Sequence, residues 1–132
     1  MIFLDTSALV AMLAREPDGS SLADKLQQTP ERLTAPHVIL ETVMRLSSLF
    51  ALAPSVVDSR VTALLRQGSV EVVPITEDIA HIAVAAFERY GKGHGKAGLN
   101  FGDCLSYACA KAHGARLLFK GDDFTYTDIA RA

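Results

Sequence analysis

Short apolar runs alternate along the chain with longer segments of helical periodicity, and this alternation constrains the fold more than any other feature. Residues 1–4, 70–74 and 116–119 are typical of buried strands, and residues 32–35 form a weaker candidate. Apolar residues recur at helical spacing in the intervals between these runs. Strands that alternate with helices predict an α/β fold with a parallel sheet and helices on both of its faces.

The length of 132 residues predicts a single domain over residues 1–132, because one core typically serves about 100–150 residues. A net charge of −2 argues against nucleic-acid binding through overall basicity. No apolar stretch reaches the roughly 20 residues that span a bilayer. The apolar start has no basic residue before it and is interrupted by Asp5, so we expect a cytoplasmic protein without an export signal.

Five acids stand where a parallel sheet of this kind binds its ligands, beyond the carboxyl ends of the strands. Asp5 ends the first strand, and Asp122 and Asp123 follow the last one. Asp103 opens the helix that leads into that last strand, and Glu41 interrupts an apolar helical segment. We therefore expect carboxylates from distant parts of the chain to converge.

Clustered carboxylates repel one another, and burial raises their cost. A fold retains such a cluster when a cation neutralises it, and all-oxygen ligands suit Mg²⁺ or Mn²⁺. The chemistry that follows is metal-assisted phosphoryl transfer or phosphodiester hydrolysis.

Each acid also has a purely structural interpretation. The run Asp5-Thr6-Ser7 can simply cap a helix, with Thr6 or Ser7 as the plausible N-cap, and Asp103 is a plausible N-cap of its own helix. Residues 122–123 suit a turn, and Glu41 can face water. Their joint placement is what favours a site.

Gly93, Gly95 and Gly98 form the string G-x-G-x-x-G in the loop between two predicted helices. A dinucleotide site is excluded because that motif requires a preceding strand. Two interpretations stay open: a flexible surface loop, or a basic flap whose Lys92 and Lys96 contact phosphates.

The remaining polar and thiol side chains predict no catalysis. His37, His81 and His113 have no partner at ligand spacing, so we expect them at the surface or at helix caps, and Ser106 is expected to pack. The two cysteines, Cys104 and Cys109, are five residues apart in one predicted helix and therefore predict buried free thiols.

Four segments resemble the PIN-domain family, and more narrowly VapC-type toxins of VapBC toxin–antitoxin pairs. The resemblance covers essentially the whole chain. The matching segments are Phe3 to Leu9, the mid-chain Glu41, Asn100 to Ala108 and Leu117 to Phe124.

This resemblance implies a three-layer α/β/α fold with a central parallel sheet of four to five strands. It implies a toxin of a type II toxin–antitoxin system that is a Mg²⁺-dependent endoribonuclease, with Mn²⁺ as a possible alternative ion. It further implies a homodimer and a VapB-type antitoxin whose C-terminal segment lies across the active site.

Carried over by position, Asp5, Glu41 and Asp103 match the core acids of the family. Asp5 and Asp103 would bind the metal most directly, and Glu41 would ligate a second ion or hold metal-bound water. The fourth acid is expected at Asp123, with Asp122 as the alternative.

Three further residues extend this expected site. Thr6 and Ser7 would support it through hydrogen bonds. Lys120 departs from the family pattern, which often has Thr or Ser nearby. It would contact substrate phosphate or pair with one of the two acids that follow it.

Two other functions remain open from sequence. A phosphohydrolase that uses Asp5 as an aspartyl nucleophile would usually carry a second Asp two residues later, where this chain has Ser7. A non-catalytic PIN-like module that binds a protein partner has no reason to retain mutually repelling carboxylates.

Overall fold

Four parallel strands form the centre of the computed structural model, which describes all residues 1–132. Their order across the sheet is β3-β2-β1-β4, which confirms the predicted parallel sheet and sets its strand number at four. The strands are β1 (Ile2–Leu4), β2 (Arg32–Thr34), β3 (Glu71–Val72) and β4 (Arg116–Leu118).

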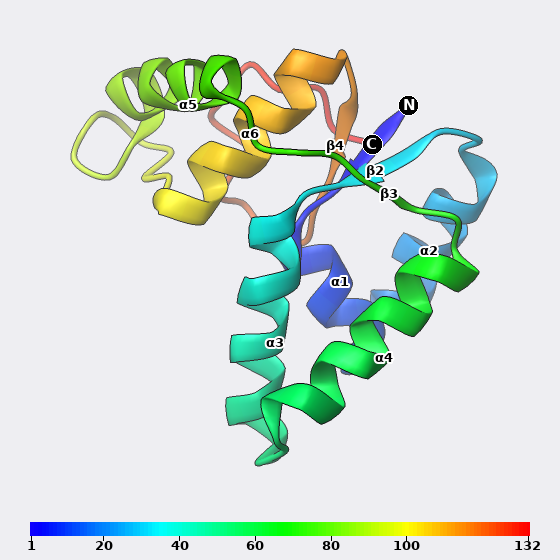
Figure 1. Cartoon of the computed structure of the whole chain (residues 1–132). Coiled ribbons are helices and arrows are strands. Elements are labelled where there is room, and N and C mark those ends of the chain that lie inside the picture. Colours follow the sequence, from blue (N-terminus) through cyan, green and yellow to red (C-terminus); the bar gives the residue numbers. More distant parts are fainter.

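Helices lie on both faces of this sheet, as the alternation predicts (Figure 1). Helix α1 lies on one face, whereas α5 and α6 pack together on the other, and α3 and α4 extend from the sheet as a pair. The helices are α1 (Thr6–Leu13), α2 (Gly19–Gln28), α3 (Pro36–Phe50), α4 (Pro54–Gln67), α5 (Glu77–Tyr90) and α6 (Phe101–His113). None of them is both long and apolar enough to cross a membrane.

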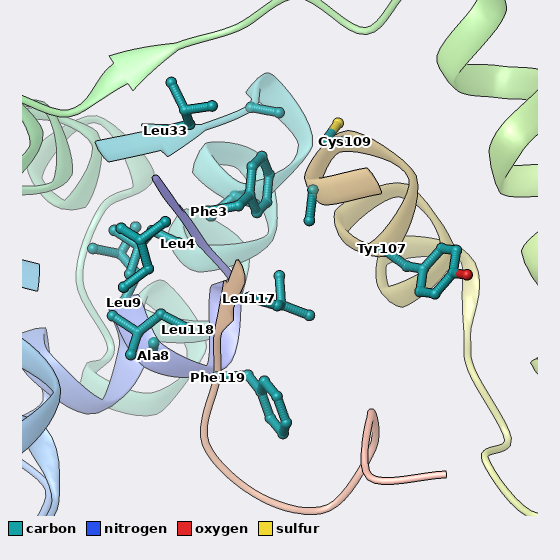
Figure 2. Packing of buried hydrophobic residues seen from close by; sticks show 14 of the residues in the cluster. Phe3, Leu4, Ala8, Leu9, Leu33, Tyr107, Cys109, Leu117, Leu118 and Phe119 are labelled. Carbon is teal, nitrogen blue, oxygen red and sulfur yellow. The ribbon is translucent and has the colours of Figure 1, made fainter. Parts of the chain in front are cut away.

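The apolar residues of β1 and β4 are buried on both faces of the sheet, which explains the continuous apolar sequence of these segments. Figure 2 shows Phe3 and Leu117 directed toward α6, and Leu4 and Leu118 directed toward α1 and its Leu9. All five side chains are fully or almost fully buried. This packing fixes the end of β1 between two helical layers.

The starts of α1 and α6 differ from the sequence-based prediction. Asp5, and not Thr6 or Ser7, is the N-cap of α1, since its carboxylate accepts the Ser7 backbone N–H. Helix α6 begins two residues earlier than predicted, with Asn100 as its N-cap. The Asn100 side chain accepts the Asp103 N–H, and Asp103 accepts the Asn100 N–H in return, which forms a capping box.

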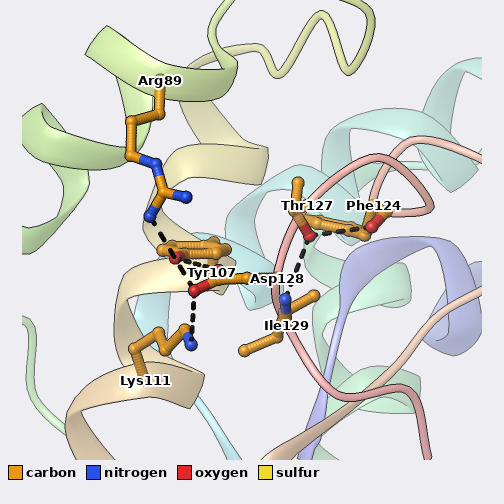
Figure 3. A network of polar contacts seen from close by, with 7 residues as sticks. All are labelled: Arg89, Tyr107, Lys111, Phe124, Thr127, Asp128 and Ile129. Carbon is orange, nitrogen blue, oxygen red and sulfur yellow. Dashed lines mark hydrogen bonds and ion pairs between the residues drawn. The ribbon is translucent and has the colours of Figure 1, made fainter.

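The segment after β4 returns to the sheet and to α6. Ala130 and Ala132 hydrogen-bond to Leu117, which makes a single parallel bridge beside β4. Figure 3 shows how Asp128 fastens this segment to α6: it accepts the Tyr107 hydroxyl at 2.5 Å and the Lys111 ammonium at 3.1 Å. Nothing in the sequence predicts this contact between the C-terminal segment and α6.

Candidate active site

Three of the predicted acids meet where β1, α3 and α6 come together. Asp5 follows β1 directly, Glu41 lies in the second turn of α3, and Asp103 lies in the first turn of α6. The Thr6 hydroxyl, next to Asp5, donates to Glu41 Oε1 at 3.2 Å. The charges of Asp5 and Glu41 both act on Asp103. The predicted convergence of distant carboxylates is therefore present.

Asp5 is the most deeply buried of these acids, with 4% of its surface exposed. Its Oδ2 accepts the Ser7 backbone N–H at 3.0 Å and the Ser7 hydroxyl at 2.7 Å. The Ser7 hydroxyl oxygen in turn accepts the Lys120 backbone N–H at 3.0 Å. Ser7 thus joins the end of β1 to the segment after β4 and holds one face of the Asp5 carboxylate.

Glu41 is pressed against the backbone of α6. A Cβ atom added to Gly102 would overlap the Glu41 carboxylate, with Cδ only 2.5 Å away. Any larger residue at position 102 would require the end of the Glu41 side chain to move away. Burial, opposed by the Thr6 hydrogen bond and assisted by the charge of Asp5, raises the pKa of Glu41.

Asp103 is half-buried within the first turn of α6. Burial raises its pKa to about 7, against the hydrogen bond from the Asn100 N–H, and the charges of Asp5, Asp123 and Glu41 raise it further. Asp122 is not among these charges. Asp123 is therefore the acid of the final turn that acts electrostatically on the cluster, although both side chains are exposed.

The carboxylate oxygens of the three acids are suitable ligands for a hard divalent cation. One oxygen of each of Asp5, Glu41 and Asp103 is held by a hydrogen bond, and the other accepts none from the chain. In this geometry no group of three His, Cys, Asp or Glu side chains is close enough to hold an ion. A cation would have to draw the free oxygens together, which it can do because their mutual repulsion favours its binding.

The predicted basic residues fall into two groups. Lys92 and Lys96 are exposed on the loop before α6, whose base is closed by hydrogen bonds from Lys92 N to Leu99 O and from Leu99 N to Tyr90 O. Lys120 instead pairs with Glu16 and, at 3.3 Å, with Asp18. It does not pair with either acid of the final turn, so that alternative was wrong.

His37 was expected at the surface or at a cap, but it lies half-buried between α3 and α6. Its Nε2 is 2.9 Å from the hydroxyl of Ser106, which is fully buried. Burial lowers the pKa of His37 to about 4, against the raising effect of the Asp5 charge, so the ring is neutral at pH 7. His81 and His113 are exposed, as expected, and both cysteines are buried free thiols.

The sequence places His37 and Ser106 on the faces of their helices that carry the site, but it does not predict their contact. His37 precedes Glu41 by four residues, and Ser106 follows Gly102 by four, so each pair shares one helix face. The two segments are more than 60 residues apart, and nothing in the sequence shows that these faces meet.

A family model for the PIN domain matches residues 2–130. The ribonuclease VapC of Mycolicibacterium smegmatis is 43% identical over 127 residues, which cover 96% of this chain and 96% of that protein. The VapC ribonuclease Mb0640 of Mycobacterium bovis is 42% identical over 127 residues, with 96% and 95% covered.

Solved structures of low sequence identity share the fold. The crystal structure of VapC20 from Mycobacterium tuberculosis, described as a sarcin–ricin loop cleaving toxin, has a TM-score of 0.76 at 21% identity and covers 100% of this chain and 98% of that one. VapBC2 from Rickettsia felis, bound to a DNA fragment of its promoter, has a TM-score of 0.75 at 16% identity, with 99% and 96% covered.

Proposed function

The chain belongs to the PIN-domain family and, within it, to the VapC ribonucleases, and from this membership we propose that residues 1–132 act as one domain that cleaves RNA with a divalent cation. It is the endoribonuclease toxin of a toxin–antitoxin pair. The observation that supports the metal-dependent chemistry is the meeting of Asp5, Glu41 and Asp103 without a compensating basic side chain. Charges left unmatched in this way mark sites that bind cations or catalyse.

The roles of the acids follow from their surroundings. Asp5, Glu41 and Asp103 would hold Mg²⁺, or Mn²⁺, through the oxygens that the chain leaves free. When bound, the cation activates water and offsets the charge that develops on the phosphate. Thr6 and Ser7 orient Glu41 and Asp5 by their hydrogen bonds.

The final turn completes the proposed site. Asp123 acts as the fourth acid, because its charge reaches Asp103, and Asp122 takes no direct part. This assignment makes substitution of Asp123 harmful and substitution of Asp122 nearly neutral for cleavage.

RNA is the substrate that we propose, held in part by Lys92 and Lys96. Both ammonium groups are exposed on the loop that leads into α6 and Asp103, and neither forms an ion pair within the chain. The Lys120 ammonium is already matched by Glu16 and Asp18, so we assign it to stability and not to phosphate binding.

Two protein partners are part of the proposal: a VapB-type antitoxin and a second copy of the chain. Structures of similar fold include a toxin–antitoxin complex from Klebsiella pneumoniae and VapBC2.

For the homodimer we assign the apolar groove of about 920 Å³ between α5 and α6, which exposes Val84, Phe87 and Phe101. Sedimentation of wild type and Val84→Glu tests it: a dimer that the substitution leaves intact would refute this surface. We place this activity in the cytoplasm, where cellular RNA is found.

The decisive experiment is incubation of purified, antitoxin-free protein with total cellular RNA, with Mg²⁺, Mn²⁺ or EDTA. Asp103→Asn is the matched control, because it keeps the size and a hydrogen-bonding oxygen of the capping box. Discrete fragments that require both the metal and Asp103 support the proposal. Absence of cleavage by folded wild-type protein would favour the non-catalytic module, and cleavage by Asp103→Asn would refute the site.

A further inference from the structure

Two of the contacts between helices α3 and α6 lie one helical turn apart. Glu41 lies against Gly102 near the start of α6, and His37 bonds Ser106 further along it. The residue number rises along α3 as it falls along α6, so the contacts form an antiparallel pair. Their shared spacing of four residues places each pair on one face of its helix.

The Glu41–Gly102 contact defines only how close the carboxylate can come to α6. No hydrogen bond joins the Glu41 carboxylate to α6, so this contact does not stop Glu41 from moving away. The only hydrogen bond on the Glu41 carboxylate comes from Thr6, which belongs to α1 and not to α6. A directional contact elsewhere between the two helices would hold α3 in place along α6.

The contact between His37 and Ser106 is directional in this way, but it places polar atoms in the interior of the protein. Ser106 is fully buried on a helix face that is otherwise formed by small and apolar residues. The His37 ring lies parallel to the Phe3 ring, with 6.4 Å between centroids and 13° between planes, and its Nδ1 is buried without a partner. A buried nitrogen without a partner is unfavourable, so packing alone does not explain a histidine here.

We propose that the hydrogen bond between His37 and Ser106 is a positioning device, which fixes α3 on α6 so that the Glu41 carboxylate stays over Gly102 and beside Asp103. The bond is directional, with a heavy-atom distance of 2.9 Å, and lies one turn, about 5.4 Å, from the carboxylate contact. Neither residue touches the substrate in this scheme. The inference deepens the proposed function, because it assigns the residues that prepare its acidic site.

A metal-free measurement tests the positioning itself. In ¹⁵N-labelled protein, His37→Ala should shift the Gly102 and Asp103 amide resonances, because Glu41 then leaves its place on the opposite helix. His37→Gln should restore them, since its terminal amide nitrogen lies as many bonds from Cα as imidazole Nε2 and can donate to Ser106. Unchanged amides in His37→Ala would overturn the proposal, whatever the protein does with RNA.

Binding of Mn²⁺, followed by calorimetry or EPR without RNA, gives the second measurement. Ser106→Ala should weaken Mn²⁺ affinity by about 10-fold and lower kcat by a similar factor with KM for RNA unchanged, whereas Ser106→Thr keeps the hydroxyl and most of the affinity. Val61→Ala removes part of a fully buried side chain of α4 and leaves a cavity there. This variant controls for general loss of stability and should leave the Mn²⁺ affinity unchanged.

A double-mutant comparison then separates the outcomes. In a Glu41→Gln background, Ser106→Ala should weaken Mn²⁺ binding no further, because the carboxylate that it positions is gone. A full additional loss in that background would overturn the role of the pair. If wild-type protein neither binds Mn²⁺ nor cleaves RNA, the proposed function fails, and the amide shifts alone decide on the positioning pair.

Discussion

Asp103 lies in α6 and Asp128 packs against it, but the surroundings of the two aspartates shift their pKa values in opposite directions. Asp128 accepts the Tyr107 hydroxyl and pairs with Lys111, and Arg89 approaches it to 3.9 Å. The Tyr107 hydrogen bond and these basic groups lower its pKa. Asp103, at the other end of the helix, has burial and three neighbouring carboxylates acting in the opposite direction, and its pKa rises to about 7.

This difference separates a carboxylate that holds the structure together from one that is available for chemistry. The protein itself neutralises Asp128, so its charge has nothing further to attract. At Asp103 the chain supplies no ion-pair partner, and Lys120, in the segment after β4, is directed to Glu16 and Asp18. A cation that binds the acidic cluster is therefore stabilised by negative charges that no basic side chain of the protein neutralises.

Substitution of each aspartate tests this division with the largest expected effect. Asp103→Asn should lower the rate of RNA cleavage by about 10³-fold or more, because it removes a charge that binds the cation. Asp128→Ala should leave the rate within about 2-fold and lower the unfolding free energy by about 1 kcal/mol, through loss of its hydrogen bonds. Cleavage assays and chemical denaturation of both variants give the comparison.

Circular dichroism spectra of both variants serve as the control for folding. A folded Asp128→Ala protein that has lost cleavage as completely as Asp103→Asn would break the distinction, since it would place the C-terminal anchor in the active site.

Gly102→Ala has the next largest expected effect. It separates the stability of α6 from the geometry of the acidic site. At an ordinary exposed helical position this change stabilises a helix by up to about 1 kcal/mol. Here the new Cβ would overlap the Glu41 carboxylate, so we expect both a loss of stability and a 10- to 100-fold loss of cleavage rate.

The background variant Glu41→Ala makes this prediction specific. Once the carboxylate is absent, Gly102→Ala should become neutral or stabilising, because nothing remains for the Cβ to displace. Equal destabilisation in both backgrounds would mean that Glu41 does not occupy the surface of Gly102 in solution.

The sequence predicted the part of this site that depends on order along the chain. The parallel sheet and the place of Asp5 follow from a short apolar strand that ends in an acid, and the roles of Glu41 and Asp103 followed from motif resemblance. Contacts between distant side chains were not predictable: His37 with Ser106, 69 residues away, and Asp128 with Tyr107, 21 residues away. Periodicity reports which face a residue occupies, but not which face of another helix it meets.

The N-caps of α1 and α6 were predicted wrongly for a related reason. Asp5, Thr6 and Ser7 all suit an N-cap by residue type, as do Asn100 and Asp103. Which residue accepts the free N–H depends on backbone angles that packing sets. The capping box of α6 shows that Asp103 can serve its helix and the acidic cluster at once.

The two aspartates should also differ in how stability responds to pH. The pKa of Asp103 is raised from an ordinary 3.8 to about 7, so its favourable contribution is complete below about pH 4 and is lost as the pH rises to about 7. The raised pKa of Glu41 acts in the same direction. The pKa of Asp128 is lowered, so its contribution is present above pH 4 and is lost in more acidic solution.

Thermal unfolding of metal-free protein between pH 4.5 and 8 measures this response. The lowered pKa of His37 makes stability rise with pH up to about 6.5, so the test is a comparison of two proteins. Between pH 5 and 8 the midpoint of wild type should fall relative to the midpoint of Asp103→Asn. Added Mg²⁺ should raise the midpoint more at pH 8 than at pH 5, since protons no longer compete for the carboxylates. The same pH response in wild type and in Asp103→Asn would contradict the raised pKa of Asp103.

The smallest expected effects concern the lysines. The Lys120 ammonium is paired with carboxylates of the protein, whereas Lys92 and Lys96 form no ion pair within the chain. Lys92→Ala and Lys96→Ala should each raise KM for RNA by about 2- to 5-fold, the effect of losing one exposed ionic contact, and the effect should shrink as salt increases. Lys120→Ala should leave KM unchanged and lower the thermal midpoint, because its partners Glu16 and Asp18 belong to the protein.

Kinetics at 50 and 200 mM salt distinguish the two classes of lysine. If Lys120→Ala raises KM in a salt-dependent way while Lys92→Ala does not, the ammonium of Lys120 must leave its carboxylates to meet the substrate. The rule that matched charges serve structure would then fail at the edge of the acidic cluster, and Glu16 and Asp18 would be competitors of the RNA phosphate for Lys120.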